Sequence, residues 1–215
     1  MKKPLEYARE IIHNRRAMSA PTRDAILDAA LGVFAARGFH GASMPALAEA
    51  AGVGAGTPYR HFESKEALVN ALYRRTKEAL MEALLVGFPF DATEREQFRV
   101  FFFRLVGFFR ARPEAFDFLE LHHHQPYLDA DNLALEARSL APVLAYFERA
   151  RRARLTRAMA PEALTAIVWG VFASLWKATR LGHLAASDEL WAQAEACAWD
   201  AVRRPDDGPD PESDR

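Results

Sequence analysis

The stretch Thr57–Phe62 of this chain brings together side chains that suit contact with a nucleic acid. It carries a hydroxyl, a phenol, a guanidinium and an imidazole within one short run. Such groups suit a hydrophobic core poorly, but they can donate hydrogen bonds to phosphate oxygens and base edges. Ser64 and Lys65 follow at the start of a further helical pattern, where free backbone N–H groups favour an anion. The combination is typical of a surface that contacts DNA.

The residues before this stretch predict the helices that would position it. A first helix is expected from about residue 22 to 37, with Gly38 as its stop. Ser43 is the predicted N-cap of a short second helix that ends at Gly52. A third helix is expected over about residues 55–62. A helix, a tight turn and another helix in this order deliver the latter to a DNA major groove.

The rest of the chain shows helical periodicity and no alternating run of β-branched residues, so we expect an all-α fold. Beyond the helix-turn-helix it is a helical bundle, in which Pro142 must kink or divide a helix over about 131–156. The predicted segments are a polar, partly helical leader (1–20), a helix-turn-helix domain (21–75), a helical domain (76–204) and a disordered acidic tail (205–215).

Charge is divided unevenly along the chain. Residues 1–75 hold 11 Lys and Arg against 7 Asp and Glu, a net charge of +4, whereas residues 76–215 carry −5. The basic excess therefore coincides with the predicted helix-turn-helix. The single cysteine, Cys197, excludes an intramolecular disulfide and a cysteine zinc site. We find no signal peptide and no run of about 20 apolar residues, so we expect a cytoplasmic protein without a membrane span.

Five sequence blocks follow one another in the first 75 residues. They are 22–30 (TRDAILDAA), 34–39 (FAARGF), 47–53 (LAEAAGV), 56–62 (GTPYRHF) and 64–68 (SKEAL). Together they resemble the DNA-binding domain of the TetR family of bacterial transcriptional regulators. The resemblance implies a homodimer that binds double-stranded operator DNA, with residues 76–204 as the ligand-binding and dimerisation domain. By that pattern the DNA contacts are Ser43, Thr57, Tyr59, Arg60, His61 and Lys65.

The chain departs from the family pattern near the third helix. The family often has Ser-Lys where this chain has Gly54-Ala55, so a helix cap and one phosphate-seeking charge are missing. Pro58 stands where leucine is common, and Pro45 replaces a frequent polar residue. Both prolines fall in a first helical turn, where proline is tolerated. The departures bear on the operator sequence rather than on the fold.

Aromatic residues crowd the predicted helix over 98–109 and recur at i, i+3 and i+7 on a later helix. Core packing or a dimer seam accounts for most of them, and the family pattern places the dimer at the helices over 161–181 and 187–204. A ligand sensor, however, needs an apolar pocket with a few polar groups. The ligand-binding candidates are Phe103, Arg104, Phe108, His122, His123, Trp169, Phe172 and Trp176.

The leading hypothesis is a dimeric regulator, a repressor released from its operator by a hydrophobic or aromatic small molecule. We expect no catalytic residue, cofactor or metal. Consecutive helical histidines point about 100° apart, so residues 122–124 cannot converge on one ion. Two alternatives stay open: an all-α metalloenzyme that uses Asp117, Glu120 and His123, and a DNA-binding dimer without an effector.

Overall fold

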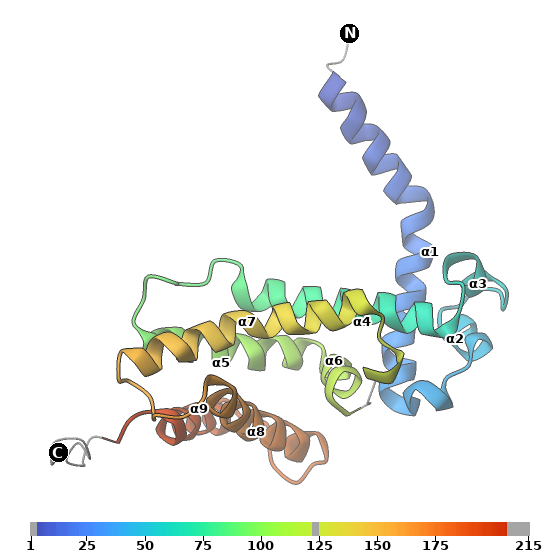
Figure 1. The fold of residues 1–215 in the computed structure, drawn as a ribbon. Coiled ribbons are helices and arrows are strands. Elements are labelled where there is room, and N and C mark those ends of the chain that lie inside the picture. Colours follow the sequence, from blue (N-terminus) through green and yellow to red (C-terminus); the bar gives the residue numbers. More distant parts are fainter. Residues whose placement is uncertain (1–3, 122–124, 206–215) are drawn as a thin grey trace, which may run out of the picture. The chain divides into compact units, whose positions relative to one another are not determined.

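The computed structural model describes residues 4–121 and 125–205, which are predominantly helical (Figure 1). Within these ranges there is no β-strand, and the predicted all-α fold class is confirmed. The elements are α1 (Pro4–Gly41), α2 (Met44–Ala50), α3 (Thr57–His61), α4 (Lys65–Leu85), α5 (Glu94–Ala111), α6 (Pro113–Phe116), the π-helix η1 (Asp117–Leu121), the 3-10 helix η2 (Gln125–Tyr127), α7 (Ala130–Arg152), α8 (Pro161–Arg180) and α9 (Asp188–Val202).

The chain forms two compact units. The head unit consists of Met1–Ala79 and Phe109–Leu135, and the bundle unit consists of Leu80–Phe108 and Glu136–Arg215. Helices α4, α5 and α7 therefore each contribute residues to both units. Residues 109–135, which the sequence assigns to the second domain, group with the head unit. The sequence-based boundary at residue 75 falls inside α4.

Serine caps and glycine stops define several helix ends, as the sequence predicts. The backbone N–H groups of the third residue after each cap donate to serine oxygens, with distances of 3.3 Å at Ser43, 3.1 Å at Ser64 and 3.0 Å at Ser187. Each bond satisfies one N–H group that the helix itself leaves unpaired. Gly38 interrupts α1 with a φ of 65°, and Gly182 follows α8 with a φ of 75°, a region that favours glycine.

Helices α1 and α7 differ from their predicted extents. Helix α1 continues toward the N-terminus as far as Pro4, whereas the leader was expected to be only partly helical. Helix α7 runs through Pro142 as a single helix, so of the two predicted effects, a kink or a division, this proline does not cause the division. A proline removes one intrahelical hydrogen bond, which the bonds on both sides can outweigh. Helix α7 also ends earlier than expected, at Arg152, and Arg154 has a φ of 58°.

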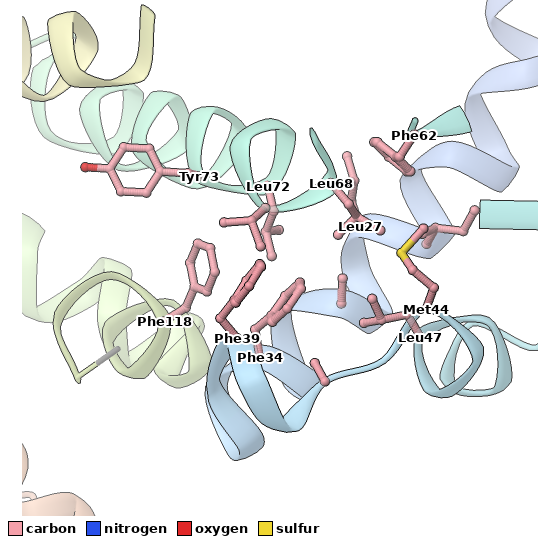
Figure 2. Close-up of a cluster of buried hydrophobic side chains, with 14 residues drawn as sticks. Leu27, Phe34, Phe39, Met44, Leu47, Phe62, Leu68, Leu72, Tyr73 and Phe118 are labelled. Carbon is pink, nitrogen blue, oxygen red and sulfur yellow. The ribbon is translucent and has the colours of Figure 1, made fainter. Parts of the chain in front are cut away.

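The core of the head unit joins α1, α2 and α4 around fully buried leucines. Leu27, Leu47 and Leu68 come one from each helix, and none is exposed. Phe118 of η1 completes this core, with its ring centroid 6.2 Å from that of Phe34 (Figure 2). Burial of each such side chain contributes about 2 kcal/mol. The three-helix head therefore depends on a residue that lies well beyond it in sequence.

The core of the bundle unit is aromatic. The ring centroid of Phe172 on α8 lies 6.0 Å from that of Phe102 on α5 and 5.5 Å from that of Trp191 on α9. Arg95 of α5 forms a two-bond ion pair with the buried Glu195 of α9. These contacts hold α5, α8 and α9 together. None of the helices described, including these apolar ones, has the length and hydropathy that a membrane span requires.

Candidate DNA-binding surface

The turn between α2 and α3 is built from backbone hydrogen bonds. The N–H of Val53 donates to the carbonyl of Ala48 (2.9 Å), and the N–H of Thr57 donates to the carbonyl of Gly54 (2.8 Å). Gly52, with a φ of 66°, makes the reversal possible. The structure thus contains the predicted helix, tight turn and helix (Figure 1). Helix α3 begins at Thr57, later than the predicted start near residue 55, and its N-cap residue Gly56 supplies no side-chain hydrogen bond.

The exposed side of α3 carries the side chains that could touch DNA. Tyr59 is 56% exposed and Arg60 is also exposed, whereas Thr57 and His61 are half-buried. Pro58 is buried, so the side of α3 that carries this proline is its inner side. Pro58 also sits in the first turn, where its missing N–H costs no helical bond. The phenol and the guanidinium are consequently free of the core and accessible to a duplex.

Arg23 is a further cation next to α3 that the sequence reasoning missed. Its guanidinium carbon lies 5.1 Å from the ring centroid of Phe62, the residue that ends α3, and its side chain is exposed. Cation–π contact holds a guanidinium in place while its N–H groups stay available. Arg23 belongs to one of the quoted sequence blocks. Its contact with Phe62 could not be predicted, because the two residues are far apart in the sequence.

The first turn of α4 favours negative charge. Ser64 caps the helix, and Lys65 and Glu66 open it. Backbone N–H bonding, together with the Ser64 hydroxyl, holds the pKa of the Glu66 carboxyl below its usual range. The same N–H groups and helix dipole would stabilise a phosphate. The anion-binding helix start that the sequence predicts thus stays a prediction, which the lowered pKa of Glu66 supports.

Lys65 is engaged inside the head. Its ammonium donates to the carbonyls of Phe39 (2.8 Å) and Ala42 (2.9 Å), which end α1 and precede Ser43. The same nitrogen lies 4.1 Å from the centroid of the Phe39 ring. An ammonium has three N–H groups, so one remains after these two bonds. Lys65 therefore fixes the junction between α1 and α2, a role that sequence reasoning missed.

Most of the predicted ligand-binding aromatics are core residues of the bundle unit. Phe108, Phe172 and Trp176 are buried, and the Phe172 ring centroid lies 5.9 Å from that of Trp176. Phe103 and Trp169 are half-buried. An aromatic residue at helical spacing has the same pattern whether it packs in a core or lines a pocket.

Arg104 stabilises the end of a helix. Its guanidinium donates to the carbonyls of Leu84 (3.0 Å), Val86 (2.8 Å) and Gly87 (2.9 Å), which lie at and just beyond the end of α4. A cation at this position satisfies carbonyls that have no intrahelical partner. The prediction of Arg104 as a ligand contact thus competes with a structural role that occupies three of its N–H groups.

The histidine run lies outside the described residues. His122 and His123, proposed as ligand contacts, and the metal site with Asp117, Glu120 and His123 therefore stay predictions. Among the residues that the structure describes, no three His, Cys, Asp or Glu side chains are grouped as metal ligands would be.

Family models match both parts of the chain. Residues 26–72 match the model for bacterial regulatory proteins of the tetR family. Residues 73–204 match the model for a tetracyclin repressor-like C-terminal domain. The first match spans the C-terminal part of α1, all of α2 and α3, and the first part of α4, and the second match covers more than half of the chain.

A curated relative is a further transcriptional regulator. The HTH-type transcriptional regulator UidR of Escherichia coli K12 is 41% identical to this chain over 68 residues, which is 32% of the chain and 35% of UidR. The match thus spans about a third of the length of that relative.

Solved structures extend the similarity to most of the fold. A TetR family transcription regulator from Marinobacter aquaeolei VT8 has a TM-score of 0.79 and 25% identity, covering 88% of this chain and all of that one (100%). A putative TetR family regulator from Vibrio parahaemolyticus has a TM-score of 0.70 and 26% identity, covering 86% and 100%. With its helix-turn-helix and both family models matched, the chain belongs to the TetR family of transcriptional regulators.

Proposed function

We propose that this regulator is a homodimeric repressor that binds a near-palindromic DNA operator and leaves it when a hydrophobic or aromatic small molecule binds. It would act in the cytoplasm, where a bacterial chromosome lies. The observation that carries the proposal is the exposed face of α3, with Tyr59 and Arg60, held by a packed head next to an anion-favouring helix start.

The side chains divide into two proposed groups. Thr57 and Arg60 on α3 would approach base edges, because a hydroxyl and a guanidinium can both donate to acceptors in the major groove. Tyr59, His61, Ser43 and the remaining N–H of Lys65 would donate to phosphates, which orient the protein without reading sequence. Arg23 joins this second group, since it is an exposed cation beside the end of α3.

Dimerisation is proposed through α8 and α9. The exposed positions Ala166, Gly170 and Ser174 are spaced four residues apart on α8, and Ala192 and Ala196 are exposed on α9. Small side chains on exposed faces allow helices of two copies to approach closely. A two-fold dimer would place two α3 helices about one DNA turn, ~34 Å, apart.

An effector would bind in the bundle unit. Phe103 and Trp169 are half-buried and so retain surface that an apolar ligand could cover. A ligand changes the operator affinity only as far as it prefers one conformation of the protein over another. Repression would therefore end when the preferred conformation separates the two α3 helices by the wrong distance.

Selection of DNA by the purified protein tests the proposed function. The wild type, incubated with a library of randomised duplexes, should enrich an inverted repeat whose half-sites are centred about 10 base pairs, or a multiple, apart. Tyr59→Ala should enrich it far less, because the exposed phenol is lost. Failure of the wild type to enrich any duplex would contradict the proposal.

A screen of apolar small molecules tests the effector. A compound that raises the melting temperature should also release the enriched duplex, since both effects follow from binding to one state. Compounds that stabilise the protein without any change in DNA affinity would favour a dimer without an effector.

A further inference from the structure

The segment from Tyr127 to Asn132 is contributed by the second family domain but packs on the head. Within the head unit, the ring of Tyr127 stacks on that of Phe39 at the end of α1, with centroids 3.9 Å apart and planes 18° apart. The Tyr127 hydroxyl and the Nε2 atom of His40 share a hydrogen bond of 2.6 Å. Both contacts reach the residues that lead directly into α2.

Asn70 of α4 fixes this segment in place. Its side-chain amide donates to the carbonyl of Tyr127 (2.7 Å), and its side-chain oxygen accepts from the backbone N–H of Asp129 (2.8 Å). Asn132 is fully buried, and its amide donates to the Asn70 side-chain oxygen (2.8 Å) and backbone carbonyl (3.1 Å). Leaving a buried amide without hydrogen-bond partners destabilises the fold, so the network favours one position for Tyr127.

Phe39 links this segment to the DNA-binding surface. Its ring is stacked on Tyr127 and also lies 4.1 Å from the Lys65 ammonium, which donates to the carbonyls of Phe39 and Ala42. Two groups that each approach the ring centre this closely must occupy opposite faces. Tyr127, Phe39 and Lys65 thus form a continuous stack that ends at the first turn of α4.

We propose that Tyr127 is a positioning residue for DNA binding. This inference rests on the proposed function and goes beyond it, because it makes residues 127–132 part of the DNA-binding unit. Tyr127 touches no DNA; it holds the Phe39 ring, which in turn positions the Lys65 ammonium and the carbonyl of Ala42. Ser43, the N-cap of α2, follows Ala42 immediately, so the start of α2 depends on the same stack.

Hydrogen exchange of the protein alone gives the first test. In Tyr127→Leu, the backbone N–H groups of residues 42–50 should exchange about tenfold faster than in wild type, because the α1–α2 junction loses its support. Tyr127→Phe keeps the stack and should restore most of the protection. Tyr146→Leu is the matched control: it removes a tyrosine whose hydroxyl donates to the Glu94 carbonyl in the bundle unit, and it should leave residues 42–50 unchanged.

A double-mutant cycle on DNA gives the second test, with the duplex that wild type enriches from a random library as the probe. Tyr127→Leu and Lys65→Met should each weaken binding about tenfold, and the double variant should be little worse than either, because both break one stack. Should Tyr127→Leu not fold, Phe39→Leu interrupts the same stack and takes its place.

The outcomes separate this inference from the proposed function. Unchanged exchange in residues 42–50, or independent effects that multiply to about a hundredfold loss in the double variant, would overturn the role of Tyr127. Failure of wild type to enrich any duplex would contradict the proposed function, while the exchange experiment would still decide whether Tyr127 positions the α1–α2 junction.

Discussion

The head unit and the bundle unit use their conspicuous side chains in opposite ways. In the head, Tyr59 is 56% exposed on α3, a helix whose inner side is taken by the buried Pro58. In the bundle unit, Phe172 is fully buried among other aromatic rings. Exposure of polar aromatic and cationic groups on a packed scaffold points to a binding surface, whereas burial of apolar rings points first to stability.

Each unit also has one cation with the same structural role. Lys65 donates to carbonyls at the end of α1, and Arg104 donates to carbonyls at the end of α4. Each compensates the partial negative charge of a helix C-terminus. The difference is that Lys65 also opens a helix next to the proposed DNA surface. Matched substitutions in the two units can therefore separate structural effects from effects on DNA.

Charge reversal of an exposed arginine should give the largest difference in DNA affinity between a head variant and a bundle variant. Arg60→Glu should weaken binding to the enriched duplex about a thousandfold, since the proposed base contact is lost and a carboxylate faces the phosphates. Arg138→Glu makes the same change at an exposed site of α7 in the bundle unit and should leave affinity nearly unchanged. Fluorescence anisotropy measures both, and equal losses would remove the distinction between the units.

A substitution on α8 should weaken dimerisation while the single chain still folds. A Cβ atom at Gly170 would meet nothing within 4 Å in a single chain. Gly170→Gln should therefore fold well and gain about 1 kcal/mol of helix propensity, yet raise the dimer dissociation constant about a hundredfold by overpacking the proposed seam.

Gly107 provides the matched control for this change. It is exposed on α5 and equally open, so Gly107→Gln should stay dimeric. Sedimentation velocity distinguishes the two variants. A dimer that survives in Gly170→Gln would exclude this face of α8 from the interface.

Loss of either helix-capping cation should lower the free energy of unfolding by a similar amount, but only one of the two losses should change DNA affinity. Lys65→Met and Arg104→Met should each lower the free energy of unfolding by about 2 kcal/mol, because charged hydrogen bonds to carbonyls are lost. Only Lys65→Met should weaken DNA binding, about tenfold, and lower the salt slope by about one. Urea unfolding and salt titrations measure these effects; an unchanged slope would mean that Lys65 touches no phosphate.

The smallest effects are expected at two serine caps. Ser64→Ala and Ser187→Ala should each cost about 1 kcal/mol of stability, since each leaves one helix N–H without its partner. Ser64 caps the helix that begins with Lys65, so only its loss should also reduce DNA affinity, by a few-fold. An equal reduction in Ser187→Ala would show that affinity follows overall stability.

Local chemistry explains which features could be predicted from sequence. Ser43, Ser64 and Ser187 act within three residues of their partners, and Gly38 and Gly52 reverse the chain where they stand, so helix ends follow from short patterns. The polar run on α3 is equally local, because the residue types themselves are unsuited to a core.

Contacts between distant residues could not be predicted in this way. Asn70 and Tyr127 are 57 positions apart, and His40 and Tyr127 are 87 apart, so no sequence period connects them. From the sequence, Arg104 is predicted as a ligand contact. Its contact with α4 is missed, because neither the residue type nor its spacing shows that carbonyls of α4 are within reach. Long-range packing decides such roles.

Binding of the wild-type protein to its selected duplex, measured by anisotropy across a range of salt concentrations, tests the central claim most directly. The account predicts two chains per duplex, a preference of at least about a hundredfold over an unrelated duplex of equal length, and affinity that falls steeply with salt. Equal affinity for the two duplexes, or no binding to either, would contradict the assignment of α3 and its neighbours as the operator-binding surface.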